Sequence, residues 1–291
     1  MIEGVRVELV DATESSARVT LAANTGANLS GDWELYGPHC EYARTLASTF
    51  RGRVTNQGNL EFLVTEPCYW SPELPFLYDV YFVSNDKRTG RMRLGLPRLS
   101  THRQSLYRAL RRIVLRGMAT ESAIASKLEE ARRAEAALLS RNPSEDECAL
   151  ADRIGVDIIA DLRYGNADMN YVLMLTRHPS VAMIMVDGNQ LLPGEVGRLP
   201  NHALLALTVY ADEEIGAARQ EISGYRAVVA DLHAQERPPA WLATCGRPVV
   251  AMRSGAAYAD IRQARADCDL LQAEFAPEFD FAGYFVGAAE E

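Results

Sequence analysis

Three aspartates lie at the ends of short apolar runs that have the length of buried strands. The runs are residues 156–162, 181–186 and 226–231, and the aspartates are Asp161, Asp187 and Asp231. Parallel sheets and barrels gather their chemistry just past the carboxyl ends of their strands. Carboxylates in that place are suited to acid and base catalysis or to binding polar ligands. The alternative is that these aspartates only cap the helices and turns that follow.

The stretch RHPSVAMIMVDGNQ, residues 177–190, adds two amide side chains to the same expected surface. Its continuous apolar run lies between Pro179 and Gly188, which favours a strand buried on both faces. Strands of this kind belong to parallel sheets. Asn189 and Gln190 follow Asp187 directly, so we expect all three to lie where a site would be built.

No pattern for a metal or a cofactor is present. Phosphate-binding glycine loops, GxSxG and HExxH are absent, and no histidine has an acidic or cysteine partner four residues away. The five cysteines are widely spaced and form no CxxC, which indicates reduced thiols rather than zinc ligands or disulfides. We therefore expect neither cofactor nor metal, and His178 is interpreted as structural.

Composition favours a soluble two-domain protein. The chain has 291 residues, of which 48% are hydrophobic, enough for a large core and for more than one domain. No run approaches eighteen apolar residues, and the first residues lack the pattern of a signal peptide. The expectation is a cytoplasmic protein with no membrane segment.

Charge differs between the two parts of the chain. Residues 1–116 carry 15 Lys and Arg against 12 Asp and Glu, whereas residues 117–291 carry 15 against 27. Residues 87–116 hold ten basic side chains and no acid. Because aromatic side chains do not interleave with these charges, nucleic-acid binding is not favoured. The preferred interpretation is a solvated hairpin that docks on the acidic second part.

The first part has the pattern of a β-sandwich. Apolar and polar residues alternate in residues 5–9 and 18–21, with the period of half-buried strands, and turn residues separate several further candidates. This spacing predicts seven strands. The segment EPCYWSPELPFLYD, residues 66–79, contains three prolines, which exclude a helix and a central strand. We expect it to cross the sandwich edge and to plug that edge with Trp70, Leu74, Phe76 and Leu77.

The second part alternates strands with helices, which indicates parallel βαβ units. Helices are predicted over residues 121–139, 144–155, 169–177, 212–223 and 258–275, the second bounded by a Ser144–Glu147 capping box and by Gly155. Counting residues 114–117 and a weak candidate at 136–140 gives eight strands, as in a (β/α)8 barrel. Only 175 residues are available, fewer than the roughly 200 to 250 usual for that fold, so some helices must be short or missing.

Two segments of the first part resemble glycoside hydrolase family 2. WSPELPFLY is similar to the closing segment of that family's immunoglobulin-like domain. RLGLPRLS followed by SLYRALRRIVLRG resembles the hairpin that leads into the first barrel strand, with Ala109 and Leu110 where most relatives carry Asn-Gly. The resemblance implies an immunoglobulin-like β-sandwich in residues 1–116 and a shortened, degenerate TIM barrel in residues 117–291.

Two further segments resemble the strands that carry this family's catalytic glutamates. In the family, a His-Pro-Ser-hydrophobic run leads to the general acid/base, whose position here falls on Asn189, or on Gln190 with one inserted residue. RPVVAMRSG resembles the strand that carries the nucleophile, and Arg253 stands at that position. A retaining glycosidase needs two carboxyl groups about 5 Å apart. Neither an amide nor a guanidinium can replace them.

The resemblance therefore implies a non-catalytic protein, a pseudoenzyme that binds carbohydrate or serves as a scaffold for a protein partner or a second copy of itself. The competing hypothesis is an active glycoside hydrolase that uses Asp161 and Asp187. The candidate ligand-binding residues are Asp161, Asp187, Gln190, Asp231 and Arg253. An exposed Arg253 beside Gln190 would suit an anionic or heavily hydroxylated ligand. A buried pair of Arg253 with Asp187 or Asp231 would indicate structural repair of a lost active site.

Overall fold

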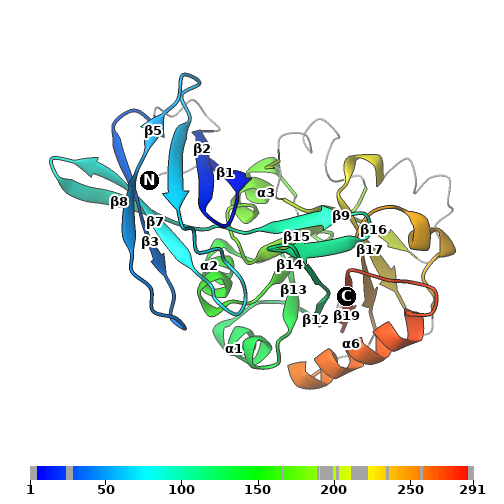
Figure 1. Ribbon diagram of the computed structural model, residues 1–291. Helices are drawn as coiled ribbons and strands as arrows, with labels where there is room; N and C mark the ends of the chain where they lie inside the picture. Colours follow the sequence, from blue (N-terminus) through cyan, green and yellow to red (C-terminus); the bar gives the residue numbers. More distant parts are fainter. Residues whose placement is uncertain are drawn as a thin grey trace.

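A β-sandwich and an α/β barrel lie side by side in the computed structural model (Figure 1). The structure describes residues 5–23, 29–165, 167–188, 190, 199–200, 203–210, 222–233, 236–255 and 258–287. Asn189 and most of the helix predicted at 212–223 lie outside these residues. Of the helices described, none is long and apolar enough to cross a membrane.

The sandwich consists of two antiparallel four-stranded sheets. One has the order β1 (Val5–Ala12), β2 (Ser16–Ala23), β6 (Leu60–Thr65), β5 (Arg53–Val54), and the other β4 (Ser48–Arg51), β3 (Asp32–His39), β7 (Leu77–Ser84), β8 (Lys87–Gly95). Alternate residues such as Val19, Leu35 and Phe62 are fully buried between the sheets. The described residues thus form eight strands instead of the predicted seven, and one of the seven, predicted at residues 113–116, lies outside the sandwich. The short β4 and β5 were not predicted, because mostly polar residues form them.

The proline-rich segment connects the sandwich to the barrel. Trp70 is 1% exposed, and its Nε1 donates a hydrogen bond of 2.9 Å to the carbonyl oxygen of Asp152 in the barrel. Leu77 is also buried, and Phe76 is half-buried. Leu74 was expected to plug the sandwich edge but is 42% exposed, because it lies in a turn closed by the hydrogen bond from Ser71 N to Leu74 O.

A three-stranded sheet follows, in the order β11 (Arg111–Ile113), β10 (Ser105–Arg108), β9 (Leu99–His102). Leu106 is fully buried and packs with side chains from inside the barrel, so this sheet covers the amino-terminal ends of the barrel strands. The β10–β11 turn is formed by Ala109 and Leu110 with φ values of 47° and 68°. Such turns favour Asn-Gly, since positive φ is unfavourable for other residues.

Eight parallel strands form the closed barrel in chain order. They are β12 (Leu115–Thr120), β13 (Ala137–Arg141), β14 (Ile158–Asp161), β15 (Val181–Val186), β16 (Leu205–Tyr210), β17 (Ala227–Leu232), β18 (Val249–Arg253) and β19 (Gly283–Val286). Each strand sends alternate side chains to an inner core and to an outer core beneath the helices. The prediction of eight strands is confirmed.

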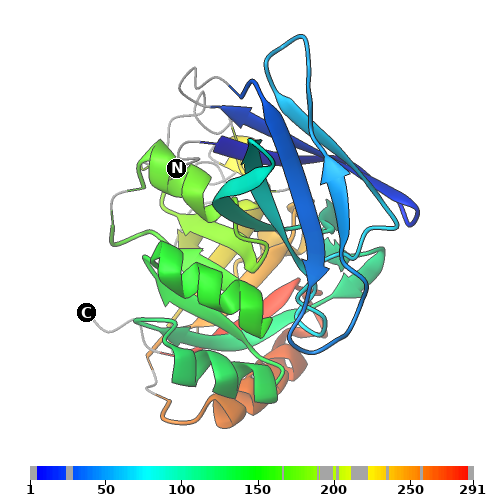
Figure 2. The same ribbon diagram turned by 90° about the vertical axis from the view of Figure 1, so that its left-hand side faces the viewer.

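The described helices cover the barrel unevenly. They are α1 (Ala125–Arg133), α2 (Glu145–Ile154), α3 (Met169–Leu175) and α6 (Ile261–Phe275), with 3₁₀ turns η1 (Ile222–Gly224) and η2 (Ala240–Thr244). Figure 2 shows α1, α2 and α3 next to one another along the outside of the barrel. The predicted capping box of Ser144 with Glu147 and the left-handed Gly155 are present on α2.

The helix predicted over residues 121–139 is wrong at its carboxyl end. α1 ends at Arg133, Glu135 has a φ of 50°, and β13 begins at Ala137. These residues have good intrinsic helix propensity, but parallel pairing with β12 and β14 buries Leu138 and Leu139 in the two cores. Tertiary packing thus overrides the local preference.

Asp152 on α2 joins three parts of the molecule. Its Oδ1 accepts hydrogen bonds from Ser180 Oγ at 2.6 Å and from Ser180 N at 3.0 Å, and its Oδ2 is 2.7 Å from His178 Nδ1. Its carbonyl oxygen accepts the Trp70 hydrogen bond from the sandwich. The His-Pro-Ser run is therefore an anchor that fixes the start of β15 to α2, and His178 is structural as predicted.

Only the later part of the basic segment docks on the barrel, because Arg88, Arg91 and Arg93 on β8 pair with Glu34 and Asp79 within the sandwich. Arg108 Nη2 lies 2.6 Å from Asp157 Oδ1, and Asp157 is buried while Arg108 is partly buried. Arg112 pairs with Asp280, and Arg116 Nε lies 3.0 Å from Asp269 Oδ1. Burial raises the pKa of Asp157, and the positive charge of Arg108 opposes this rise. These pairs connect the hairpin and the first barrel strand to acidic residues on other barrel elements.

We expect Asp152→Ala to lower the free energy of unfolding by about 3 kcal/mol or more, since it leaves the Ser180 and His178 donors unpaired in a buried site. Asp146→Ala is the matched control, an exposed residue of the same helix, and should cost less than about 1 kcal/mol. Urea denaturation of both variants measures the difference. Equal losses would contradict the anchoring role.

Leu110→Gly should raise the free energy of unfolding by about 1 kcal/mol, because it relieves an unfavourable positive φ without removing a buried contact. Leu63→Gly tests the opposite case, since Leu63 is also exposed but lies within β6. Glycine there should destabilise the protein by about 0.5–1 kcal/mol. Thermal melting of the two variants should therefore give shifts of opposite sign.

Candidate functional site

Two of the predicted aspartates point into the barrel mouth at the carboxyl ends of the strands. On β14, Ile159 lies in the inner core, and Asp161 two residues later has the same orientation. On β17, Val229 and Asp231 are related in the same way. Asp161 is 2% exposed and Asp231 7% exposed, so both carboxylates are buried.

A buried arginine that the sequence analysis did not identify lies between these carboxylates. Arg163 donates from Nε to Asp161 Oδ1 at 3.0 Å and from Nη2 to Asp161 Oδ2 at 2.9 Å. Its Nη1 donates to Asp231 Oδ2. Burial alone would lower the pKa of Arg163, but the hydrogen bonds and charges of the two aspartates raise it above its usual value. One guanidinium thus holds both carboxylates.

Asp187 lies beside this cluster without an ion pair among the described residues. It follows β15, and Tyr210 Oη on β16 donates to its Oδ1 at 3.4 Å. Burial raises the pKa of Asp187, and the positive charge of Arg163 opposes this rise. Burial and the negative charge of Asp187 raise the pKa of Tyr210. Asp187 is half-buried, whereas Asp161 and Asp231 are buried.

Gln190 has its amide committed to the backbone. Its Oε1 accepts a hydrogen bond of 2.9 Å from Asp187 N, and its Nε2 donates to Leu162 O at 2.9 Å and to Arg163 O at 3.1 Å. The side chain therefore ties the segment after β15 to the segment after β14. Gln190 positions Asp187 and Arg163, and its amide is already occupied by these bonds.

Tyr164 adds an aromatic ring at the edge of the mouth. It is 58% exposed, and the guanidinium groups of Arg141 and Arg163 lie 4.5 Å and 5.1 Å from its ring centroid. Arg141 is also paired with Glu121 at 3.3 Å. An exposed ring supported in this way can form one wall of a binding site. The pattern DLRYG, which follows a predicted strand, was the available sequence indication for Arg163 and Tyr164.

The structure does not bring Arg253 to the mouth. Val249 and Ala251 on the same strand belong to the outer core, and Arg253 continues that face. Its Nη1 and Nη2 donate to Glu274 of α6 at 2.8 and 2.9 Å, and its guanidinium lies over Phe275. This hydrogen bonding lowers the pKa of Glu274. The pairs considered with Asp187 or Asp231 are not formed.

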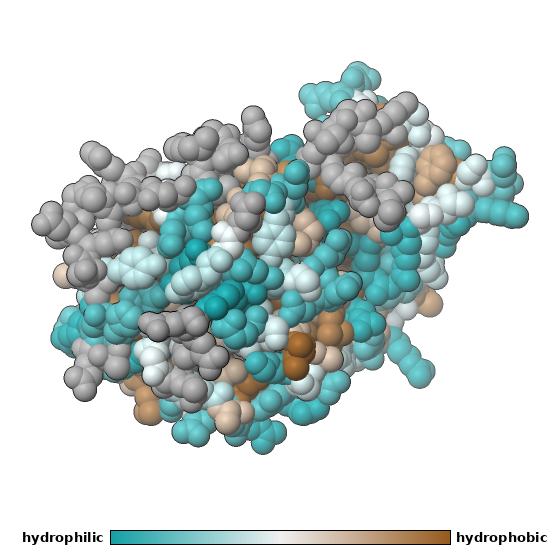
Figure 3. All heavy atoms as spheres, turned by 180° about the vertical axis from the view of Figure 1, so that it is seen from behind, coloured by the Kyte–Doolittle hydropathy of each residue, from teal (hydrophilic) through white to brown (hydrophobic). Residues whose placement is uncertain are grey.

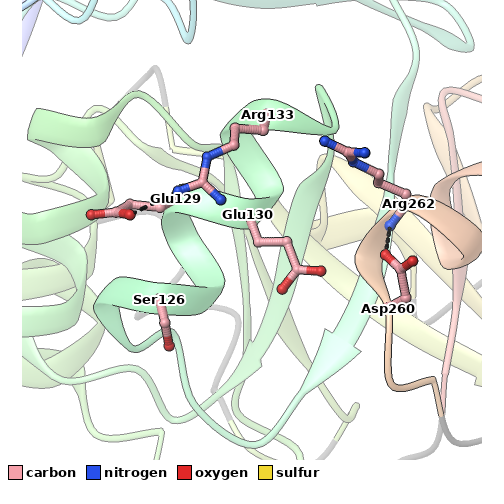
Figure 4. A pocket seen from close by; sticks show the side chains of 6 residues that line it. All are labelled: Ser126, Glu129, Glu130, Arg133, Asp260 and Arg262. Carbon is pink, nitrogen blue, oxygen red and sulfur yellow. Dashed lines mark hydrogen bonds and ion pairs between the residues drawn. The ribbon is translucent and has the colours of Figure 1, made fainter.

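Hollows also lie elsewhere on the described part of the molecule, and two of them are lined by several charged side chains. The first, between α1 and the start of α6, is lined by Ser126, Glu129, Glu130, Arg133, Asp260 and Arg262 (Figure 4). Within it, Glu129 pairs with Arg133, and Asp260 caps α6. The second, at the amino-terminal end of the barrel, contains the Arg108–Asp157 pair. In both hollows, charged side chains already form ion pairs or caps that hold elements together. Residues at the amino-terminal face of a barrel usually contribute to stability.

Solved structures with a similar fold include three β-glucuronidases. The FMN-binding enzyme from Facaelibacterium prausnitzii L2-6 gives a TM-score of 0.68 at 11% identity, covering 97% of this chain and 55% of its own. The enzyme from Bifidobacterium dentium, complexed with coumarin-3-O-glucuronide, gives 0.61 at 10%, covering 97% and 59%. The enzyme from Ruminococcus gnavus, in complex with D-glucuronic acid, gives 0.64 at 10%, covering 97% and 60%.

These similarities show a glycoside-hydrolase-like fold of barrel and antiparallel sheets. The chain spans less than two thirds of the length of these enzymes. No protein-family model matches the chain, and no curated protein matches it.

Asp187→Asn tests the environment of the unpaired carboxylate. A raised pKa means that the folded protein disfavours the ionised Asp187 carboxylate. The resulting loss of folding stability is present above the pKa of the folded state, and it disappears below the pKa of the unfolded chain, about 3.9. The variant should be more stable than the natural chain at neutral pH, by less than about 1 kcal/mol because the group is half exposed. The gain should shrink towards pH 4. Denaturation across this range measures it, and Asp86→Asn, in an exposed turn, should show no gain.

Proposed function

We propose that this chain is a glycoside-hydrolase-like protein that binds a carbohydrate at the barrel mouth and does not hydrolyse it. The proposal includes an immunoglobulin-like sandwich in residues 1–116 and a degenerate TIM barrel in residues 117–291. The observation that carries it is the bridging of Asp161 and Asp231 by Arg163. A retaining glycosidase needs one carboxylate free to attack the sugar and a second carboxyl group to exchange a proton.

The bridging arginine opposes both of these roles. Asp161 uses both oxygens to accept hydrogen bonds from Arg163, and Asp231 uses one. A carboxylate whose charge and lone pairs are engaged by a buried guanidinium is a weak nucleophile. Releasing it would leave an uncompensated buried charge, at a cost of about 3–5 kcal/mol. The three groups are therefore suited to holding the mouth open in a fixed shape.

The remaining groups are suited to binding. Asp187 and Tyr210 offer partly exposed oxygen atoms, and Tyr164 offers an aromatic face. Sugar hydroxyl groups donate to carboxylates, and an aromatic wall with a few polar groups is typical of small-molecule sites. We assign Asp161 and Gln190 to positioning, Asp187 and Asp231 to ligand contact, and no ligand contact to Arg253.

An enzyme that uses Asp161 and Asp187 is the competing proposal. One observation favours it, because burial raises the pKa of Asp187, as a general acid requires. Its second carboxylate, Asp161, is held bidentately by Arg163. Asp187 would then have to act without a free nucleophile.

A scaffold for a protein partner or a second copy of the chain is supported less well. Among the described residues, the most exposed apolar side chains are Leu46 and Leu110, which belong to different parts of the fold, the sandwich and the β10–β11 turn. On the face visible in Figure 3, hydrophilic side chains predominate and apolar ones occur in small separate groups. Interaction surfaces usually show a contiguous patch.

All five cysteines are free thiols, which supports our assignment to a reducing compartment such as the cytoplasm.

The proposal predicts no hydrolysis of aryl β-glucuronides, β-galactosides or β-mannosides above background. An aryl leaving group needs little acid assistance, so these substrates test mainly for a nucleophile. Release of the aryl alcohol by purified chain measures the rate. Turnover that is lost in Asp161→Asn or Asp187→Asn, but kept in Asp86→Asn, would establish the competing enzyme instead.

A further inference from the structure

Carboxylates outnumber cations in the part of the mouth that the structure describes. Asp161 and Asp231 pair with one arginine, Arg163, and Asp187 has no ion pair among the described residues. Arg141, the nearest other cation to Tyr164, is paired with Glu121. After these pairs are formed, two formal negative charges are left among the three aspartates and Arg163. A ligand bound there meets a negative potential.

Within the described part of the chain, Asp231 has one carboxylate oxygen without a partner. Its Oδ2 accepts from Arg163, whereas its Oδ1 is buried and has no hydrogen-bond partner there. Asp231 is only 7% exposed, and its position on β17 directs its side chain to the inside of the barrel. A buried acceptor without a donor costs about 1–3 kcal/mol, and such an atom in a folded protein calls for an explanation. A ligand donor in the mouth would remove that cost.

Asp187 is a second acceptor with spare capacity on the same side of the mouth. Its Oδ1 accepts a long hydrogen bond of 3.4 Å from Tyr210 Oη. Tyr210 on β16 is in register with Asp231 on β17. Asp187 follows β15, which is the neighbour of β16 on its other side. Asp187 and Asp231 therefore lie two strands apart at the same end of the barrel, with Tyr210 between them.

We propose that the mouth binds a ligand that carries a primary ammonium group next to hydroxyl groups, with the ammonium donating to Asp231 Oδ1 and the negative charge of Asp187 adding to its attraction. This rests on the proposed function and adds the class of ligand to it. An ammonium group brings three donors and a positive charge, whereas a hydroxyl brings one donor and no charge. A uronic acid, as named in the Ruminococcus gnavus complex, would add a further carboxylate to a mouth that already has an excess.

The test is a comparison of D-glucosamine, N-acetyl-D-glucosamine, D-glucose and D-glucuronate, titrated into the full chain and followed by NMR at about pH 6.5, where a primary amine is protonated. We expect glucosamine to bind about tenfold or more tightly than glucose and than the uncharged N-acetyl sugar, with glucuronate weakest. Added salt should weaken glucosamine selectively, because screening acts on the charge.

Variants separate the carboxylates from the general surface. Asp187→Asn keeps the shape and the Tyr210 contact and should reduce the preference for glucosamine over glucose by about fivefold or more. Asp231→Asn should do the same, provided that circular dichroism shows a folded protein. Asp86→Asn, on the sandwich, is the matched control and should leave the preference unchanged.

Three results would overturn the inference. Equal binding of glucosamine and glucose, or tighter binding of glucuronate, would contradict the ammonium preference but leave carbohydrate binding in place. A glucosamine preference that persists in both Asp187→Asn and Asp231→Asn would place the ammonium elsewhere. Absence of binding for all four sugars would contradict the proposed function together with the inference.

Discussion

The guanidinium of Arg163 is the interaction on which the upper end of the barrel depends. It reaches from the end of β14 to Asp231 on β17, two strands that are not neighbours in the sheet. Hydrogen bonds between adjacent strands fix the wall of the barrel, but only a side chain of this length can fix the distance across it. Removing one partner of such a buried network leaves a charge uncompensated. A substitution at one of the three residues is therefore expected to be tolerated only together with substitutions at the others.

The lower end of the barrel is held in a different way. Leu106 covers the inner core, and the Asp152 anchor fixes α2, the start of β15 and Trp70 of the sandwich to one another. These contacts are apolar packing and hydrogen bonds, and the ion pairs of Arg108 with Asp157 and of Arg112 with Asp280 add to them at the same end. Both ends contain ion pairs, but at the mouth one buried guanidinium bridges two carboxylates, whereas at the lower end the Asp152 anchor joins the barrel to the sandwich.

Much of this architecture follows from local sequence. Alternation and apolar runs identified the barrel strands, and the Ser144–Glu147 pair with Gly155 identified both ends of α2. Local reasoning failed where distant contacts decide the outcome. β13 is a strand because β12 and β14 pair with it, although its residues favour a helix. Arg163 was missed because its partner Asp231 lies 68 residues away.

Arg253 illustrates why a family resemblance locates a strand better than a side chain. A shift of one residue in a strand exchanges the inner and the outer face. The segment RPVVAMRSG is a barrel strand as the resemblance implies, yet Met252 faces the inner core and Arg253 faces α6. The cation that replaces a carboxylate in the linear comparison is thus absent from the mouth. A cation that the comparison did not indicate, Arg163, decides the chemistry there. Because it stabilises negative charge on two aspartates at once, it favours electrostatic binding over proton transfer, and function follows from which face each charge occupies.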